Sequence, residues 1–315
     1  MKTLIGIDSG GTSCRFVLCD ESGAVLAQTI LPGHNPHTDG LPALESTLRR
    51  GLDTVTAGFG GRAGTFDALH AGIAGSEGAN HSAVLAMLQT LLPGCARIRL
   101  SSDAVIALSS GLGTQDGAVL IAGTGTVGFL RRKGELSRFG GWGYLLDHAG
   151  SGWHIGRDGF SAALACADAG LPATVLTALY EQALGCGMTD AVSALYRGDL
   201  SLSALAPLVF RAAKQGDAPA LRIVRDNAQA LFETIMQMQR AFGAELPVVL
   251  AGGLWKEPLY AEELTRLCAG KPIRLIHPAL PPVFGAILLA AAEAGLPEYT
   301  EFALRFAERA SSGIG

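Results

Sequence analysis

Two glycine-rich turns have the residue types that bind phosphate. The first is Ser9-Gly10-Gly11-Thr12-Ser13 and the second is Gly123-Thr124-Gly125-Thr126. Glycine allows positive φ and a close approach of the backbone to a ligand, and successive N–H groups form an anion-binding nest. The threonine and serine hydroxyls add further donors. Either turn alone is also compatible with an ordinary hairpin, but the two together predict a clamp on a polyphosphate.

Two aspartates stand where short apolar strands are expected to end. Asp8 ends the first apolar run and is suited to hold Mg²⁺ through water. Asp103 follows Ser101-Ser102, where a strand passes into a helix. An N-cap would explain Asp103. A general base that accepts the proton of a substrate hydroxyl, as phosphoryl transfer requires, would explain it equally, and one residue can do both.

A third glycine pair follows the apolar run Val248–Leu250. The sequence Ala251-Gly252-Gly253-Leu254 takes the chain from an expected strand into an expected helix. Paired glycines at such a place leave room for a flat ring against the backbone, which favours adenosine binding at Gly252 and Gly253. Close helix–strand packing explains the same glycines as well.

The elements that position these residues occur twice. Strands are expected at 3–8, 15–20 and 24–30, and the same strand–turn–strand–turn–strand order restarts at residue 117. Helical periodicity covers 41–58, 81–92, 103–112, 151–168, 171–184, 201–215, 218–242, 256–269 and 283–294. The alternation predicts an α/β fold with an N-terminal domain (1–115), a C-terminal domain with helical insertions (116–296) and a final helix (297–315). A ligand is expected in a cleft between the domains.

Composition limits the class of protein. The chain has 315 residues, of which 49% are hydrophobic and 17% charged, with a formal net charge of -4. These values favour compact domains and argue against a nucleic-acid partner. No apolar run is long enough to span a membrane, and Asp8 comes too early for a signal-peptide core. The six cysteines contain no C-x-x-C pair, so we expect reduced thiols in a cytoplasmic protein.

The motifs, taken in order, resemble the N-acetylglucosamine kinase and BadF/BadG-type ATPase family of the actin and hexokinase superfamily. The resemblance runs from about residue 4 to 291 and rests on these segments: Gly6-Ile7-Asp8-Ser9-Gly10-Gly11-Thr12, Asp103, Gly123-Thr124-Gly125, Gly140-Gly141-Trp142-Gly143, Ala251-Gly252-Gly253 and Pro282-Val283-Phe284-Gly285-Ala286. It implies two RNase-H-like (actin-like ATPase) domains, ATP with Mg²⁺, a small sugar as substrate, and a final helix that returns to the first domain. We also expect a homodimer.

The resemblance also implies roles for individual residues. Asp103 corresponds to the catalytic base, and the sugar-side positions are Asn35, Ser76, Thr124 and Gly141. There is one departure. After Gly140-Gly141-Trp142-Gly143 the family commonly reads Gly-Asp-Glu-Gly-Ser, whereas this chain reads Asp147-His148-Ala149-Gly150-Ser151. Either Asp147 replaces the family's sugar-binding aspartate by a local shift, or His148 supplies a different hydrogen bond.

The expected function is therefore ATP-dependent phosphorylation of a sugar hydroxyl, with O6 of N-acetylglucosamine or glucosamine as the acceptor. The alternative is a BadF-type ATPase that activates a dehydratase or reductase. Such activators hold a four-iron iron–sulfur cluster through cysteines, and Cys166 and Cys186 are the candidates here. A sugar-sensing repressor is disfavoured, because the sequence has neither a helix-turn-helix arm nor a zinc-binding cysteine cluster.

Overall fold

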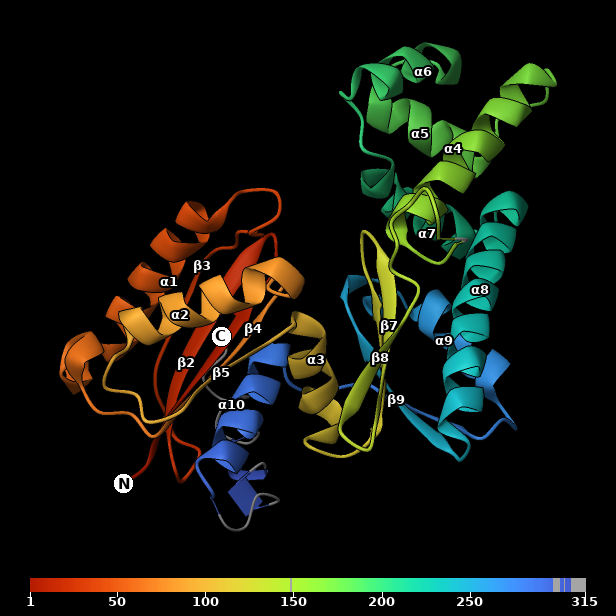
Figure 1. Ribbon diagram of the computed structural model, residues 1–315. Coiled ribbons are helices and arrows are strands. Elements are labelled where there is room, and N and C mark those ends of the chain that lie inside the picture. Colours follow the sequence, from red (N-terminus) through yellow and green to blue (C-terminus); the bar gives the residue numbers. More distant parts are fainter. Residues whose placement is uncertain (148, 297–300, 303, 307–315) are drawn as a thin grey trace. The chain divides into compact units, whose positions relative to one another are not determined.

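The computed structural model describes residues 1–147, 149–296, 301–302 and 304–306, and it divides into two compact units (Figure 1). Unit 1 comprises Met1–Gln115 together with His277–Gly315, and unit 2 comprises Asp116–Ile276. Across the ranges that the structure describes, every helix is too short or too polar to span a membrane.

Unit 1 is built on a mixed sheet with the order β3-β2-β1-β4-β5. Strands β1 to β3 form an antiparallel meander, and β4 and β5 continue the sheet in parallel with β1. Nearly every residue of the central strands β1 and β4 is buried, because helices cover both faces of the sheet. The strands are β1 (Thr3–Ser9), β2 (Ser13–Asp20), β3 (Val25–Pro32), β4 (Ala68–Ile73) and β5 (Ile98–Ser101).

Two pairs of helices cover the sheet of unit 1. Helices α1 (Leu41–Thr56) and α2 (His81–Leu91) bury their apolar faces on one side, in a core with alternate residues of β1, β2 and β4. Helices α3 (Asp103–Leu112) and α10 (Pro282–Glu293) cover the other side. The expected meander and the helices at 41–58, 81–92 and 103–112 are therefore confirmed.

Unit 2 repeats the strand order of unit 1. Its sheet runs β10-β9-β6-β7-β8, with an antiparallel meander followed by two parallel strands. The strands are β6 (Gly117–Ala122), β7 (Thr126–Arg132), β8 (Glu135–Phe139), β9 (Leu246–Ala251) and β10 (Ile273–Ile276). The internal duplication expected from the two glycine turns thus extends to the whole topology of each sheet.

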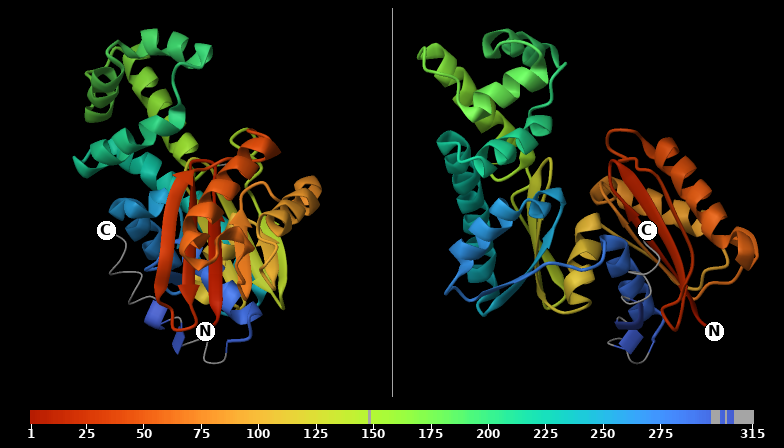
Figure 2. Two further views of the ribbon diagram at one scale, coloured as in Figure 1. Left: turned by 90° about the vertical axis from the view of Figure 1, so that its left-hand side faces the viewer. Right: turned by 180° about the vertical axis from the view of Figure 1, so that it is seen from behind.

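The helices of unit 2 form two groups. Helices α8 (Ala218–Phe242) and α9 (Pro258–Cys268) lie along one face of the sheet, whereas α4 (Gly152–Asp168), α5 (Val175–Leu184) and α6 (Met188–Arg197) gather beyond its end (Figures 1 and 2). Helix α7 (Ala206–Lys214) packs against both α4 and α8. All of these helices contribute to one apolar core with β6 and β9.

Two helices of unit 2 differ from the expectation. Helix α5 begins at Val175 rather than at 171, because Pro172 interrupts the pattern and the Thr174 hydroxyl caps the helix by accepting the N–H of Thr177. Helix α6 had no counterpart in the expected elements. It is flanked by Gly187 and Gly198, which adopt the conformations of an N-cap and a left-handed C-cap.

Residues 277–296, expected in the C-terminal domain, lie in unit 1. Helix α10 passes so close to its neighbours that glycine is required at the crossings. A Cβ at Gly6 would lie 2.9 Å from Ile287 Cγ1, and a Cβ at Gly285 would lie 1.9 Å from the Ile106 carbonyl oxygen. Among the described residues that follow, Phe306 stacks on Phe284, within the apolar core of unit 1.

The substitution Gly285→Ala should destabilise unit 1 by about 1–3 kcal/mol, because the added methyl group forces α10 away from α3. The measurement is chemical unfolding, monitored by far-UV circular dichroism. Gly58→Ala is the matched control, since a Cβ there would meet nothing within 4 Å. Equal midpoints for the two variants would contradict the role assigned to this crossing.

Candidate active site

The first glycine turn links β1 to β2. The N–H of Gly10 donates to the Ser13 carbonyl at 3.0 Å, and a Cβ at Gly33 would lie 2.1 Å from the Gly10 carbonyl oxygen. Positive φ was expected at Gly10 and Gly11, but neither has it. What distinguishes Gly11 is open space, because a Cβ there would meet nothing within 4 Å. The turn therefore leaves room for a ligand next to its backbone.

The second glycine turn links β6 to β7 and is held by the start of α4. The N–H of Gly123 donates to the Gly125 carbonyl at 2.9 Å, and the N–H groups of Gly152 and Trp153 donate to the carbonyls of Gly123 and Thr124 at 2.8 and 3.2 Å. Gly123 and Gly125 also lack positive φ, and both face open space. The carbonyls are thus engaged on one side while Thr124 and Gly125 remain exposed.

The two candidate aspartates, Asp8 and Asp103, lie at the same end of the sheet of unit 1. Asp8 pairs in register with Gly72 of β4, and Gly72 pairs with Ser101 of β5, two residues before Asp103. Asp103 is the first residue of α3, whereas the expected cap position belongs to Ser102. Its carboxylate accepts the N–H of Ala104 at 3.0 Å. The side chain of Asp103 therefore does not cap α3 in the usual way and is half-buried beside Asp8.

Burial dominates the electrostatics of this carboxylate pair. Burial and, to a smaller extent, the charge of Asp103 raise the pKa of Asp8 to about 6, while the Arg15 guanidinium acts in the opposite direction. Burial also raises the pKa of Asp103, while the hydrogen bond from Ala104 opposes that shift. Arg15 lies directly opposite Asp8 in the antiparallel register. The sequence analysis missed this cation, although its position four residues past the glycines places it on the second strand of the hairpin.

The carboxylate pair fits a divalent cation. Among the residues whose placement is described, no group of three or more His, Cys, Asp or Glu gathers as a metal site. Mg²⁺ needs few protein ligands, because it keeps several waters and shares phosphate oxygens with a nucleotide. A cation beside Asp8 would offset both causes of its raised pKa, the burial of its charge and the repulsion from Asp103. The environment of Asp8 is therefore compatible with its expected role as a ligand of Mg²⁺.

The loops that carry Asn35 and Ser76 lie next to each other in unit 1. A Cβ at Gly75, whose φ is +75°, would lie 2.4 Å from Asn35 Oδ1. Asn35 Oδ1 accepts the N–H of His37 at 2.9 Å. The Ser76 hydroxyl is buried and donates to the Ile73 carbonyl at 2.7 Å. Asn35 is thus placed at the rim of this loop, whereas the side chain of Ser76 holds the loop together.

A pocket of about 210 Å³ opens beside the second glycine turn, entirely within unit 2. It brings together the expected sugar-side residues Thr124, Gly141 and Asp147. It also contains aromatic residues that the sequence analysis did not single out: Tyr144 stacks on Trp153 with ring centroids 4.6 Å apart. An aromatic surface beside polar groups suits the mixed apolar and hydroxylated faces of a sugar ring.

His154 is fixed at the back of this pocket. Its Nε2 lies 3.0 Å from the Asp147 carbonyl, and its Nδ1 lies 2.6 Å from the Ser151 hydroxyl. Because a carbonyl can only accept, Nε2 carries the hydrogen and Nδ1 accepts from Ser151. Burial lowers the pKa of His154, which favours this neutral form. The imidazole therefore ties the start of α4 to the loop that precedes it.

Asp147 closes the glycine-rich loop 140–147. Its two carboxylate oxygens accept the N–H groups of Trp142 and Gly143, both at 3.1 Å. Arg138 completes the loop by donating to the carbonyls of Gly140 and Gly141 and by stacking on the Trp142 ring, with its guanidinium carbon 4.6 Å from the ring centroid. His148, the other candidate to replace the family's sugar-binding aspartate, lies outside the described residues.

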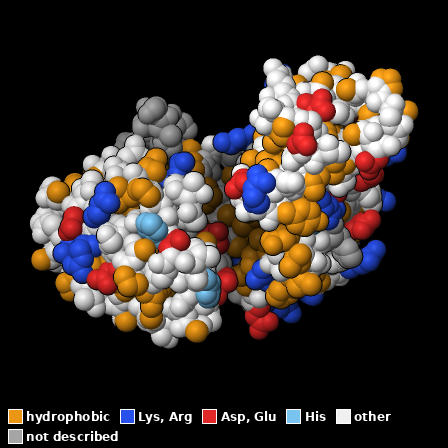
Figure 3. All heavy atoms as spheres, turned by 90° about the horizontal axis from the view of Figure 1, so that it is seen from above, with side chains coloured by type: hydrophobic (Ala, Val, Ile, Leu, Met, Phe, Trp, Pro, Cys, Tyr) orange, Lys and Arg blue, Asp and Glu red, His pale blue; other side chains and the backbone are white. Residues whose placement is uncertain are grey.

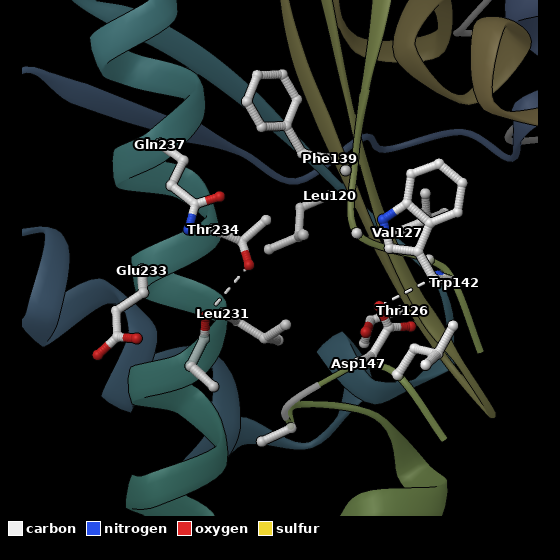
Figure 4. Close-up of a pocket in the computed structure, with 16 residues that line it drawn as sticks. Leu120, Thr126, Val127, Phe139, Trp142, Asp147, Leu231, Glu233, Thr234 and Gln237 are labelled. Carbon is white, nitrogen blue, oxygen red and sulfur yellow. Dashed lines mark hydrogen bonds between the residues drawn. The ribbon is translucent and has the colours of Figure 1, made fainter. Parts of the chain in front are cut away.

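The same loop forms a wall of a second pocket, of about 280 Å³, between the β7–β8 hairpin and α8 (Figure 4). Trp142 and Asp147 face it from the loop, and Leu231 and Thr234 face it from the helix. The loop also exposes Leu145, which is 81% accessible. Figure 3 shows hydrophobic side chains on the surface of the molecule in orange. The glycine-rich loop thus separates two pockets and offers each of them a face of Asp147.

A third pocket, of about 260 Å³, joins the second glycine turn to the third glycine pair. Gly123 and Thr124 line it together with Gly253, and Phe210 adds an apolar ring that the sequence analysis did not identify. Gly252 has a different role: its φ is +104° and a Cβ would lie 2.2 Å from the Ala122 carbonyl oxygen. Close packing on β6 therefore explains Gly252, whereas Gly253 faces open space in the pocket.

Cys166 and Cys186, the candidate ligands of an iron–sulfur cluster in the alternative function, lie in ordinary helical surroundings. Cys166 is buried in α4, with its thiol 3.3 Å from the Pro172 carbonyl oxygen. Cys186 is half-buried and follows α5. Neither belongs to a group of metal-ligating side chains within the described part of the chain.

The chain is similar to a known protein family over most of its length. The model of the BadF/BadG/BcrA/BcrD ATPase family matches residues 5–290. N-acetyl-D-glucosamine kinase of Dictyostelium discoideum is 29% identical over 312 residues, covering 92% of this chain and 98% of the relative. Glucosamine kinase GspK of Vibrio cholerae is 33% identical over 160 residues, or 50% of this chain and 52% of its own.

The fold is shared with solved structures. The crystal structure of a candidate N-acetylglucosamine kinase from Chromobacterium violaceum aligns with a TM-score of 0.69 at 24% identity, covering 92% of this chain and 99% of the other. The expected α/β fold with two actin-like domains is therefore confirmed.

The substitution Asp8→Asn should stabilise the ligand-free, metal-free protein at neutral pH by about 1–3 kcal/mol. Folding raises the pKa of Asp8 from 3.8 to about 6, so the ionised carboxylate costs stability above that pH. The cost shrinks as the pH falls below about 6 and disappears below 3.8, where Asp8 is protonated in both states. Thermal unfolding at about pH 7.5 and about pH 4.5 measures the change.

Asp226→Asn, at an exposed position of α8, is the control for this pH series. The difference between the two variants should be largest at the higher pH and clearly smaller at the lower one. A stabilisation by Asp8→Asn that is independent of pH, or a loss of stability at neutral pH, would show that burial of the Asp8 charge is not the cause.

Proposed function

Because this chain belongs to the BadF/BadG/BcrA/BcrD ATPase family, we propose that it is an ATP-dependent amino-sugar kinase that phosphorylates O6 of N-acetylglucosamine or glucosamine. The similarity to N-acetylglucosamine and glucosamine kinases supports the class of substrate. The observation that carries the proposal is the half-buried Asp8–Asp103 pair beside a glycine turn that recurs in unit 2 with the same strand order.

Asp103 is the general base in this proposal. Phosphoryl transfer to an alcohol requires little covalent chemistry from the protein, but the attacking hydroxyl has to be oriented and its proton accepted. A carboxylate whose pKa burial has raised accepts a proton more readily near neutral pH than an exposed one. The exocyclic O6 reaches further from the ring than the other hydroxyls, so it suits a base that is half-buried at a helix start.

The glycine turns bind the nucleotide phosphates. In unit 1, backbone N–H groups and hydroxyls of Gly10, Gly11, Thr12 and Ser13 supply donors, and in unit 2 the turn Gly123–Thr126 does the same. Arg15 adds positive charge on the strand that follows the first turn. Mg²⁺, when bound by Asp8 through water, neutralises phosphate charge during transfer.

Two pockets of unit 2 are the proposed binding sites of the adenosine and of the sugar. The pocket at Gly253 has the apolar ring of Phe210 for adenine and Thr124 at its phosphate end. The pocket at Thr124, Gly141 and Asp147 has stacked aromatic rings and polar groups for the sugar. Thr124 lines both pockets, which is the position expected for a residue near the phosphate that is transferred. In unit 1, the amide of Asn35 is the proposed sugar-binding group.

The substitution Asp103→Ala should reduce sugar phosphorylation by at least about a thousandfold, because the acceptor hydroxyl loses its base. ATP affinity should change by less than about threefold, since Asp103 contacts no phosphate in this proposal. A coupled ADP-release assay with N-acetylglucosamine measures turnover, and isothermal titration measures ATP binding. Turnover at the wild-type rate would exclude Asp103 as the base.

The substitution Gly253→Val should raise the KM for ATP about tenfold, because the side chain enters the pocket proposed for adenosine. The KM for the sugar and the melting temperature should remain close to the wild-type values. Gly58→Val is the matched control, since this glycine also lacks positive φ and a Cβ there would meet nothing within 4 Å. If both variants had the same KM for ATP, the nucleoside would have to bind elsewhere.

A further inference from the structure

The imidazole of His70 lies in the middle of β4 and is only 6% exposed. Its Nδ1 is 3.0 Å from Glu293 Oε1, and its Nε2 is 2.9 Å from the Ser101 hydroxyl. These contacts join the last residue of α10 to the last residue of β5 through a third element. The proposed reaction gives His70 no role, yet a buried polar chain of this kind is costly unless every member is satisfied.

The chain ends at the junction that carries Asp103. Ser101 closes β5, and Asp103 opens α3 two residues later. The Ser102 hydroxyl has no hydrogen-bond partner within the described structure and makes no cap bond, so the side chain of Ser102 does not hold this junction. The side-chain bonds that do hold it come from His70, to the Ser101 hydroxyl, and from Ser76, to the Ser101 carbonyl at 3.3 Å.

The proton arrangement strengthens the link to α3. The Ser101 hydroxyl also lies 3.2 Å from the Ser102 carbonyl, which accepts the N–H of Val105 at the start of the helix. When Nε2 of His70 donates to Ser101, the hydroxyl donates onward to Ser102. When Nε2 accepts instead, the hydroxyl turns towards the imidazole. His70 therefore determines the direction of the Ser101 hydroxyl, and when Nε2 donates, that hydroxyl also bonds the Ser102 carbonyl in the first turn of α3.

At the other end of the chain, Glu293 Oε1 contacts His70, whereas Oε2 is buried without a hydrogen-bond partner within the described structure. Glu293 belongs to α10, which packs on β1 beneath Asp8 and on α3 beyond Asp103 at the glycine crossings described above. The path from Glu293 through His70 to Ser101 therefore joins α10, β4 and β5, which pack against β1 and α3, the two elements that carry the carboxylates. The described hydrogen bonds of His70 and Ser101 go to neither carboxylate.

We propose that His70 is a positioning residue for Asp103, acting through Ser101. This inference rests on the proposed function, in which Asp103 is the base. His70 orients the strand–helix junction so that the Asp103 carboxylate meets the acceptor hydroxyl in the productive direction. A small misorientation of a base lowers the rate of the chemical step more than it lowers the affinity for either substrate.

Two substitutions of the same residue separate positioning from folding. In His70→Gln the terminal amide reaches the place of Nε2 and can bond Ser101, whereas in His70→Asn the shorter amide reaches only the place of Nδ1 and bonds Glu293. We expect His70→Asn to lower kcat about tenfold or more with the KM for ATP unchanged. His70→Gln should stay within about threefold of the wild-type kcat. Ser101→Ala should reproduce the loss and Ser101→Thr should restore it.

Thr56→Val is the stability control. Its hydroxyl is fully buried in α1 and donates to the Leu52 carbonyl at 2.7 Å, far in the sequence from Asp103. The kinetics are compared with the melting temperature of each variant, measured on the full chain with ATP, Mg²⁺ and N-acetylglucosamine. Loss of kcat in His70→Asn and Ser101→Ala beyond that of a Thr56→Val protein of equal stability supports positioning.

Two results would overturn the inference. Equal kcat values for His70→Asn and His70→Gln, or for Ser101→Ala and Ser101→Thr, would show that the bond to Ser101 has no catalytic consequence while the wild type is an active kinase. A wild-type protein that phosphorylates no amino sugar would remove the proposed function and this inference with it. The serine pair decides the matter if the His70 variants do not fold.

Discussion

The burial of two neighbouring carboxylates, Asp8 and Asp103, is the constraint on which the candidate site of unit 1 depends. Both side chains are half-buried, burial raises the pKa of each, and the charge of Asp103 raises that of Asp8 further. Left alone, such a pair would move apart or take up protons. It persists because each aspartate is attached to a rigid element, β1 or α3, whose position is determined by packing. The strain is located where a cation and a transferred phosphate would relieve it.

Glycine is the means by which the fold enforces this geometry. Gly6 admits Ile287 of α10 against β1, and Gly285 admits the backbone of α3. At Gly72, on the row that runs from Asp8 to Ser101, a Cβ would lie 2.4 Å from Ile106 of α3. Helices and sheet therefore approach more closely than side chains would permit. Unit 2 repeats the strand order around its own glycine turn. There the turn is held by backbone hydrogen bonds from the start of α4.

Local patterns in the sequence predicted much of this arrangement, because strand alternation, glycine turns and helix periodicity are encoded by neighbouring residues. The role of Gly252 could not be predicted, because a glycine that packs closely on β6 and a glycine that leaves room for a ligand look the same in a sequence. Helix α6 was missed, although its flanking glycines were a usable signal. The His70 network was hidden for a different reason: Glu293 is 223 residues away, and only the tertiary fold makes them neighbours.

The most direct test of the account is the identity of the phosphorylated product. The full chain is incubated with ATP, Mg²⁺ and each of N-acetylglucosamine, glucosamine and glucose, and ³¹P NMR is recorded with proton coupling. The account predicts that ADP and an amino-sugar phosphate form in equal amounts, with the new phosphorus coupled to both protons on C6. ATP hydrolysis without a sugar phosphate, or phosphorus coupled to the single anomeric proton, would contradict it.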